Sequence, residues 1–167
     1  YRVGIAGDGF ASTGDYQFRV LDVAAAAPFV PGAVVSDVLA PARSTVLYRF
    51  EGVAGGLYFF DGRPTSGFSV IPQTRLYGPL GNILFERSVS SDEDVFALPQ
   101  TGTYTLTVEG RYFDNNASGR YAFNLQPVSH VTNALSVGVL VTNVVATVGQ
   151  RHFYDFALAG PRRMYFD

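Results

Sequence analysis

Two segments of the chain align with each other without a gap, and this match constrains the fold more than any other feature. Residues 32–61 align with residues 138–167 at an offset of 106 residues (138 − 32). Eight positions of this alignment are identical: Gly32/Gly138, Val35/Val141, Val38/Val144, Ala40/Ala146, Tyr48/Tyr154, Phe50/Phe156, Phe60/Phe166 and Asp61/Asp167. Similarity at one fixed spacing is typical of tandem repeats, in which neighbouring units complete a shared core. The sequence therefore predicts tandem repeats of about 106 residues.

A second match joins the N-terminal end of the chain to the later part of the repeat. Residues 13–20 align with residues 118–125 at an offset of 105, and residues 1–7 align with residues 104–110 at an offset of 103. The small differences in offset indicate short insertions or deletions in the loops between the copies.

These matches predict three parts. Residues 1–23 are expected to be the C-terminal strands of a preceding repeat, and residues 24–129 to form one complete repeat. Residues 130–167 are expected to be the N-terminal strands of the following repeat. We therefore expect the chain to be a segment of a longer array, whose end pieces cannot bury their apolar faces alone.

Short runs of alternating apolar and polar residues indicate strands with one buried face. They occur at residues 16–20, 46–50, 104–108 and 121–125, each flanked by Gly, Pro or polar residues. The turn formers of residues 78–82 predict a hairpin loop. The predicted fold class is all-β, an antiparallel, jelly-roll-like β-sandwich.

Composition excludes several classes of function. The formal net charge is −2 and the pI is about 5.6, so no broad basic face is available to bind nucleic acid. No apolar run approaches the roughly 18 residues of a membrane helix, and we expect no membrane insertion. Cysteine is absent, which excludes disulfides, zinc–thiolate sites and thiol catalysis.

No catalytic motif is recognisable, and we expect a protein that is not an enzyme. The two histidines are His130, in a predicted linker, and His152, which aligns with Val46. A shared catalytic role therefore does not fit both repeats. The sequence also lacks G-x-S-x-G, H-E-x-x-H and a glycine-rich phosphate loop.

Four strand motifs together resemble a known bacterial family. They are Leu47–Phe50, Leu57–Asp61, Arg75–Asn82 and Thr101–Gly110. In order, they resemble pre-peptidase C-terminal-like (PPC) domains, especially the tandem forms of very large secreted or surface-anchored proteins. The resemblance implies a non-catalytic β-sandwich that accompanies exported proteases or is stacked in adhesins, with some relatives binding calcium, collagen or carbohydrate.

Acidic residues in two loops are the candidates for a metal site. Calcium requires six to eight oxygen ligands converging from loops. The candidates are Asp92, Glu93 and Asp94 in one loop and Asp114 in another. Both clusters are also ordinary polar turns, so no cofactor is predicted and calcium remains the alternative.

Two further groups are candidates for binding. Tyr112 and Phe113 fall in a loop, outside the apolar phase of any strand, and are expected either to form a contact surface or to cap the sandwich. Asp61 and Asp167 recur at the end of an aromatic strand, where an aspartate can bind a ligand or accept hydrogen bonds from turn amides.

The functional hypothesis is a structural repeat of a long extracellular bacterial surface protein, acting as a spacer and in assembly or adhesion. The expected location is secreted or cell surface, and the expected partners are neighbouring copies of the repeat. One alternative is a self-assembling fibre or sheath subunit, a homo-oligomer joined by strands at the ends of the chain. The edge residues are Tyr1, Val3, Ile5, Tyr165 and Phe166. A carbohydrate-, protein- or calcium-binding module is the other alternative.

Overall fold

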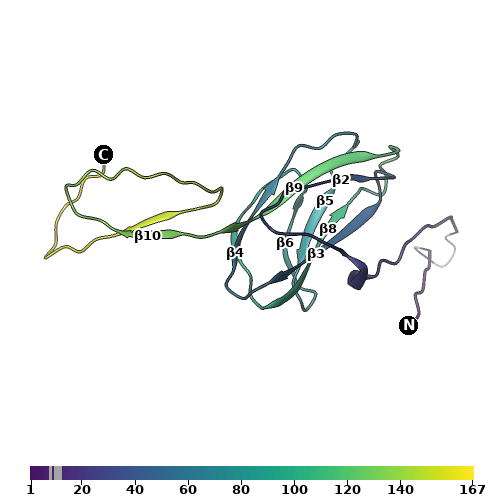
Figure 1. Ribbon diagram of the computed structural model, residues 1–167. Helices are drawn as coiled ribbons and strands as arrows, with labels where there is room; N and C mark the ends of the chain where they lie inside the picture. The colour runs from purple at the N-terminus through teal and green to yellow at the C-terminus, as the bar shows by residue number, and fades with distance from the viewer. Residues whose placement is uncertain (8, 10–12) are drawn as a thin grey trace.

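Two β-sheets pack face to face in the computed structural model, which describes residues 1–7, 9 and 13–167. The five-stranded sheet has the order β1-β3-β8-β5-β6 and the four-stranded sheet has the order β2-β9-β4-β7. Their strands are β1 (Ala27–Pro28), β2 (Val35–Leu39), β3 (Thr45–Gly52), β4 (Leu57–Gly62), β5 (Gln73–Tyr77), β6 (Ile83–Ser88), β7 (Glu93–Ala97), β8 (Gly102–Glu109) and β9 (Gly119–Val128). The predicted all-β sandwich is confirmed, and Figure 1 shows its two layers. Its strand pairs are antiparallel as expected except for β1 and β3, which pair in parallel.

Strands β8 and β9 are each paired on both sides. Strand β8 pairs with β3 and β5, and β9 pairs with β2 and β4, all antiparallel. The alternation seen in the sequence places Leu106 of β8 and Phe123 and Leu125 of β9 in the core, where all three are fully buried. These two strands therefore hold the two sheets together.

Aromatic rings fill the space between the sheets. The Phe123 ring stacks on Phe60 at a centroid distance of 5.7 Å and meets Tyr48 edge-on at 5.5 Å. Phe29 packs edge-on against Phe50 and Phe123 at 5.4 and 5.8 Å. Because each large buried ring contributes about 1.5–3 kcal/mol by leaving water, this cluster makes a large contribution to stability.

The predicted hairpin is formed by β5 and β6. The two strands pair antiparallel, with Arg75 opposite Glu86 and Leu76 opposite Phe85. The loop closes through the Gly78 amide, which donates to the Asn82 carbonyl at 2.8 Å. Turn formers at both ends of the loop thus set the register of the pair, as the sequence predicted.

The N-terminal segment differs from the expectation. The described residues before Asp22 contain no strand, although residues 16–20 show strand alternation. The alternation is the same as in β9, but β9 has partner strands on both edges and residues 16–20 have none in the structure. The segment ends in a short 3₁₀ turn, Val23–Ala25. No helix in the described part of the chain is long and apolar enough to cross a bilayer.

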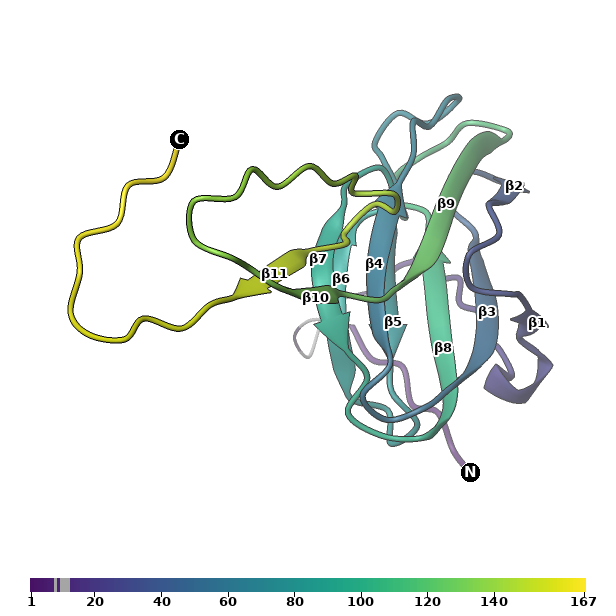
Figure 2. The same ribbon diagram turned by 60° about the vertical axis from the view of Figure 1, so that its left-hand side comes forward.

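The C-terminal segment forms fewer strands than expected. Strands β10 (Val131–Ala134) and β11 (His152–Asp155) pair in parallel and form a separate two-stranded sheet. Residues 141–145 and 163–167, which align with β2 and β4, are not strands. Figure 1 shows the segment reaching beyond one side of the sandwich, and in Figure 2 the part after β11 continues away from it. Neither β10 nor β11 pairs with a third strand among the described residues.

Replacing Phe123 by Ala is expected to lower the free energy of unfolding of the sandwich by about 3–5 kcal/mol, because the deletion leaves a cavity in the aromatic cluster. The matched control is Phe18→Ala, since Phe18 aligns with Phe123 but is 61% exposed. We expect it to change the stability of the sandwich by less than about 0.5 kcal/mol. Urea unfolding of dilute protein, followed by tyrosine fluorescence, measures both, and equal losses would contradict the assigned core.

Candidate functional site

The three acidic candidates of residues 92–94 have separate partners, and two of them, Glu93 and Asp94, lie in β7 rather than in the expected loop. Asp92 accepts a hydrogen bond from the Gly62 amide at 2.9 Å, which ties the loop to the end of β4. Glu93 forms an ion pair with Arg87. Asp94 is exposed and pairs with Arg151 of the C-terminal segment at 3.0 Å. Each carboxylate therefore holds a different element.

Asp114 is fully buried and accepts hydrogen bonds from the backbone. Its Oδ2 accepts from the Ser69 amide at 2.8 Å, and its Oδ1 accepts from the Asn116 amide at 3.0 Å. These bonds, led by the one from Asn116, lower the pKa of Asp114 below its ordinary value. The carboxylate fastens the loop of residues 110–118 to residues 67–70.

The two acidic loops do not converge on a common point. Among residues 1–7, 9 and 13–167, no group of three or more His, Cys, Asp or Glu side chains lies close enough together to hold a metal ion. The backbone contacts of Asp92 and Asp114 favour the reading of these loops as structured turns. A sequence alone does not separate the two readings, because the amide partners are distant in the chain.

The binding candidates lie apart from one another. Asp61 accepts from the Arg63 side chain at 2.8 Å at the end of β4, whereas its counterpart Asp167 is exposed at the chain end. Tyr112 is 86% exposed, and its ring meets Phe113 edge-on at 5.0 Å. This aromatic pair is open to solvent.

The histidines do not form a catalytic arrangement with each other. His130 lies just before β10, and its Nδ1 accepts from the Arg151 amide at 3.2 Å. His152 lies in β11, with its ring edge-on to Tyr154 at 6.5 Å. Both are thus engaged in the C-terminal two-stranded sheet.

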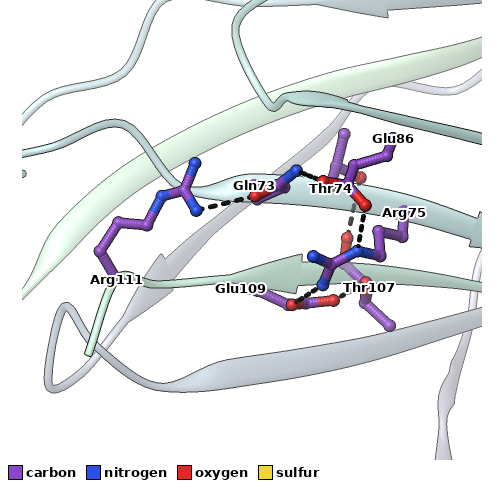
Figure 3. Close-up of polar contacts among 7 residues, drawn as sticks. All are labelled: Gln73, Thr74, Arg75, Glu86, Thr107, Glu109 and Arg111. Carbon is purple, nitrogen blue, oxygen red and sulfur yellow. Dashed lines mark hydrogen bonds and ion pairs between the residues drawn. The ribbon is translucent and has the colours of Figure 1, made fainter.

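A polar network that the sequence analysis did not identify crosses β5, β6 and β8 (Figure 3). Arg75 donates to Glu86 at 2.7 Å and forms an ion pair with Glu109. Arg111 donates to Gln73 at 2.7 Å, next to the same strands. Glu86 and then Glu109 raise the pKa of Arg75, and Arg75 lowers that of Glu86. The charges are mutually satisfied, so the network ties strands together.

Beside this network, a groove of about 670 Å³ follows the outer face of the five-stranded sheet. Its floor is formed by β3 and β8, including Arg49 and Thr105, and its rim by the β5–β6 loop. Leu21 and Val23, from the segment that leads into the sandwich, form part of its wall. The groove is therefore a place where a connecting segment crosses the sheet.

The C-terminal segment reproduces backbone contacts of the sandwich at the offset of 106 residues. Ala27 is paired with Tyr48 in the sandwich, and Asn133 is paired with Tyr154 in the C-terminal sheet. The Phe29 amide donates to the Arg49 carbonyl at 3.0 Å, and the Leu135 amide donates to the Asp155 carbonyl at 2.8 Å. Three further features recur at this offset: the turn bonds Ala33–Val30 and Val139–Ser136, the turn bonds Ser44–Pro41 and Gln150–Thr147, and the positive φ of Gly32 and Gly138.

One side-chain contact recurs at the same offset. In the sandwich, the Tyr48 hydroxyl donates to Asp37 at 2.8 Å, and Asp37 also accepts from the Val38 amide. In the C-terminal segment, the amide of Asn143 donates to the Tyr154 hydroxyl at 3.2 Å, and Asn143 accepts from the Val144 amide. The identical tyrosines and the Asp/Asn match were visible in the sequence, but their contact was not.

Tyr48 has an additional partner, for which Tyr154 has no counterpart among residues 1–7, 9 and 13–167. The Tyr48 and Tyr121 hydroxyls lie 2.6 Å apart, inside the core. Burial, followed by the bond with Tyr121, raises the pKa of Tyr48, and burial also raises that of Tyr121. The residue that aligns with Tyr121 is Tyr16, which is exposed in the N-terminal segment.

Apolar residues of both terminal segments are exposed where their counterparts are buried. Phe166 is 98% exposed, whereas Phe60 is fully buried. Phe18 shows the same contrast with Phe123. The other exposed/buried pairs are Tyr1/Tyr104, Val3/Leu106, Ile5/Val108, Tyr16/Tyr121, Val20/Leu125 and Phe156/Phe50. Tyr165 is 90% exposed as well, so all five predicted edge residues lie on the surface and outside strands.

The C-terminal segment also touches the sandwich. Gly149 lies so close to β4 and β7 that a Cβ atom on it would come within 2.9 Å of the side chains of Phe59 and Val95. The neighbouring Arg151 forms the ion pair with Asp94. The turn before β11 thus rests on the outer face of the four-stranded sheet.

Comparison with known proteins identifies no family. No family model matches the chain, and no curated protein matches it in sequence. The resemblance to PPC domains therefore stays a prediction.

Several solved structures match part of the chain at low similarity. A periplasmic inhibitor of g-type lysozyme, PliG, from Aeromonas hydrophila matches with a TM-score of 0.45 at 17% identity, over 60% of this chain and 96% of its own. PliG from Salmonella Typhimurium gives 0.44 at 22%, with the same coverage. The Glycosylation Associate Protein (Gap123) complex of Streptococcus agalactiae matches with a TM-score of 0.35 at 12% identity, over 77% of this chain and 54% of its own. With TM-scores below 0.5, none of these likenesses assigns a function.

Replacing Asp114 by Asn is expected to lower stability at neutral pH. The side-chain NH₂ of Asn would face one of the backbone N–H groups that now donate to the carboxylate, and two donors cannot form a hydrogen bond. The pKa of Asp114 is lowered by folding, so its contribution is present above the ordinary value of 3.8 and is lost as the pH falls. Urea unfolding between pH 2 and 7 measures this effect. The free energy of unfolding should fall less at acid pH in Asp114→Asn than in the exposed control Asp94→Asn. A chelator should change neither; a loss of stability on chelation would instead support a calcium site.

The Tyr48–Tyr121 pair predicts a loss of stability in alkali. Folding raises the pKa of both tyrosines above the ordinary value of 10.0. Their contribution to the free energy of unfolding is therefore complete below about pH 10 and falls as the pH rises above it, by about 1.4 kcal/mol per pH unit for each tyrosine. In the double variant Tyr48→Phe, Tyr121→Phe, the free energy of unfolding should fall less between pH 10 and 12 than in the original protein. Tyr112→Phe, which alters an exposed hydroxyl, is the control, and urea unfolding at each pH is the measurement.

Proposed function

We propose that the chain is a structural repeat of a long extracellular surface protein, in which β-sandwich modules act as spacers and associate with their neighbours. The module is the sandwich of β1 to β9, and residues 130–167 are the beginning of the next module. The role is non-catalytic and needs no cofactor.

The observation that carries this proposal is the recurrence of contacts at the offset of 106 residues. The recurring features include a parallel strand pair, turn bonds, a left-handed glycine and a Tyr–Asp/Asn bond. Two unrelated segments have no reason to share all of these at one spacing. An isolated beginning of a sandwich, with its apolar residues exposed, is useful only where further strands complete it.

The joint between successive modules gives the array its mechanical character. The connection from β9 to β10 runs from Val128 to Val131. Because this connection is short and Gly149 and Arg151 rest against β4 and β7, the second module is held against the first. The proposed array is therefore a semi-rigid rod, in which length is set by the number of modules. A compact module of this size has a radius of gyration of about 13 Å.

The Tyr112–Phe113 pair favours a second role, contact with another protein or with carbohydrate. Both rings are exposed, and the loop that carries them is anchored by the buried Asp114. An exposed, preorganised aromatic pair is a low-entropy contact surface. The same extracellular module would then act both as a spacer and as an adhesive contact.

Extension of the chain tests the proposed repeat. A copy of residues 62–128 is added directly after Asp167, which aligns with Asp61. If residues 130–167 begin a module, the added strands complete it and bury Phe156 and Phe166. Hydrogen exchange should then show at least about 100-fold slower exchange of the amides of β10 and β11 than in the original chain.

The matched control carries the same added residues in scrambled order, which keeps length and composition but not the strand pattern. The proposal predicts slow exchange in β10 and β11 only with the ordered extension. If the ordered and scrambled extensions leave exchange in β10 and β11 equally fast, residues 130–167 are not the start of a repeat.

A further inference from the structure

We propose that the groove on the outer face of the five-stranded sheet binds an acidic saccharide, a short chain of sugar rings that carries carboxylates. The groove encloses about 670 Å³, within the range of about 300–1,000 Å³ that small-ligand sites occupy. Its described lining does not include Tyr112 or Phe113, so this site is separate from the exposed aromatic pair. The inference goes beyond the proposed function and does not depend on the repeat equivalence.

One row of side chains across three strands carries the polar groups of the groove. Arg49 of β3 is opposite Thr105 of β8, and Thr105 is opposite Tyr77 of β5. Opposite residues on neighbouring strands share a face of the sheet, and all three of these residues line the groove. Because neighbouring strands lie about 4.8 Å apart, the row spans roughly 10 Å from β3 to β5. Two linked sugar rings can cover this span, with one ring at Arg49 and the other at Tyr77.

Arg49 gives the groove its charge. Among the described residues that line the groove, it is the only one with a charged side chain. Its guanidinium forms no ion pair within the part of the chain that the structure describes. Glu51, two residues along β3, is not among the lining residues and accepts a hydrogen bond from the Thr103 hydroxyl at 2.7 Å. An unpaired guanidinium among neutral groups complements an anion, and its planar fork fits a carboxylate through two parallel hydrogen bonds.

Thr105 and Tyr77 match the other groups of a sugar. The hydroxyls of Thr103 and Thr107 donate to glutamates, whereas the Thr105 hydroxyl has no hydrogen-bond partner among the described residues. Thr105 is only 9% exposed, so its free hydroxyl lies at the bottom of the groove. A hydroxyl both donates and accepts, as the hydroxyls of a sugar do. The Tyr77 ring adds an apolar face, on which the C–H face of a sugar ring can pack.

The strand order favours a saccharide over an acidic peptide as the ligand. Strand β3 lies between β1 and β8, and β8 lies between β3 and β5. The floor of the groove therefore has no open backbone edge, to which an extended peptide could add as a further strand. Recognition has to come from side chains, and those present are a guanidinium, hydroxyls and an aromatic ring.

The rim and the wall of the groove are held in place by contacts of their own. On the rim, Pro79 packs so closely on the start of β8 that a Cβ atom on Gly102 would come within 2.9 Å of it. On the wall, the segment that carries Leu21 is fixed by Arg19, which donates to the Thr45 carbonyl at 2.8 Å. A site whose walls are ordered before the ligand arrives loses less entropy on binding.

A titration followed by amide NMR shifts tests the ligand class with the chain unchanged. The probe is trigalacturonate, and the matched neutral probe is its fully methyl-esterified form. Trigalacturonate should shift the amides of Arg49, Thr105 and Tyr77, and the ester should bind at least about tenfold more weakly because it cannot pair with a guanidinium. Triglutamate, a peptide with carboxylates, should also bind at least about tenfold more weakly. No saturable shift up to about 10 mM trigalacturonate, or equal binding of any two probes, would overturn the proposal.

Substitutions in the same titration test the assigned groups. Arg49→Gln should raise the Kd for trigalacturonate at least about tenfold, since the ion pair with the carboxylate is lost. Thr105→Val, which removes the hydroxyl and keeps the shape, and Tyr77→Leu, which removes the ring, should each raise it at least about threefold. The matched control is Arg120→Gln, an exposed arginine of β9 in the other sheet, and it should leave the Kd within about twofold. Equal losses in Arg49→Gln and Arg120→Gln would show that binding follows net charge and would contradict the site.

The outcomes separate this inference from the repeat proposal. The extension of residues 62–128 is measured by hydrogen exchange in β10 and β11, neither of which lines the groove. If the extension orders these strands while trigalacturonate does not bind, the repeat stands and the saccharide site is wrong. If trigalacturonate binds through Arg49 while the extension fails, the saccharide site stands and the repeat equivalence is wrong.

Discussion

Antiparallel pairing of β8 and β9 with neighbours on both sides is the constraint on which the rest of the structure depends. These two strands carry Leu106, Phe123 and Leu125 into the core, and each also satisfies backbone groups of two other strands. Without them, β2, β3 and β4 would have open edges and exposed rings. The terminal segments show this situation directly, because they contain related sequences without the corresponding neighbours.

The comparison of Phe18 with Phe123 separates local preference from tertiary structure. Both lie in runs with the same alternation, yet one is 61% exposed and the other is fully buried. Alternation indicates which side chains of a strand share a face, but a strand is formed only where an edge is available to pair with it. The strand predicted at residues 16–20 was wrong for this reason, while the predictions for β3, β8 and β9 were confirmed.

The acidic loops show a second limit of sequence reasoning. Asp92 and Asp114 occur in runs that resemble ligand-binding loops, and their sequence neighbours are polar. The structure pairs them with the amides of Gly62 and Ser69, which are 30 and 45 residues away. A carboxylate that accepts bonds from backbone amides stabilises a loop by itself, whereas a metal site requires several carboxylates to converge.

The sequence by itself determined the all-β class, the β5–β6 hairpin, the apolar phase of the central strands and the regular offset of 106 residues, because these depend on short-range alternation, turn formers and direct similarity. Only the tertiary structure decided which strands are neighbours, that the Tyr48 hydroxyl meets Tyr121, and that Arg75 joins Glu86 to Glu109. The contact of Tyr48 with Tyr121 follows from the stacking of two sheets, and the contacts of Arg75 follow from the order of the strands within one sheet. Neither arrangement is encoded in a local pattern.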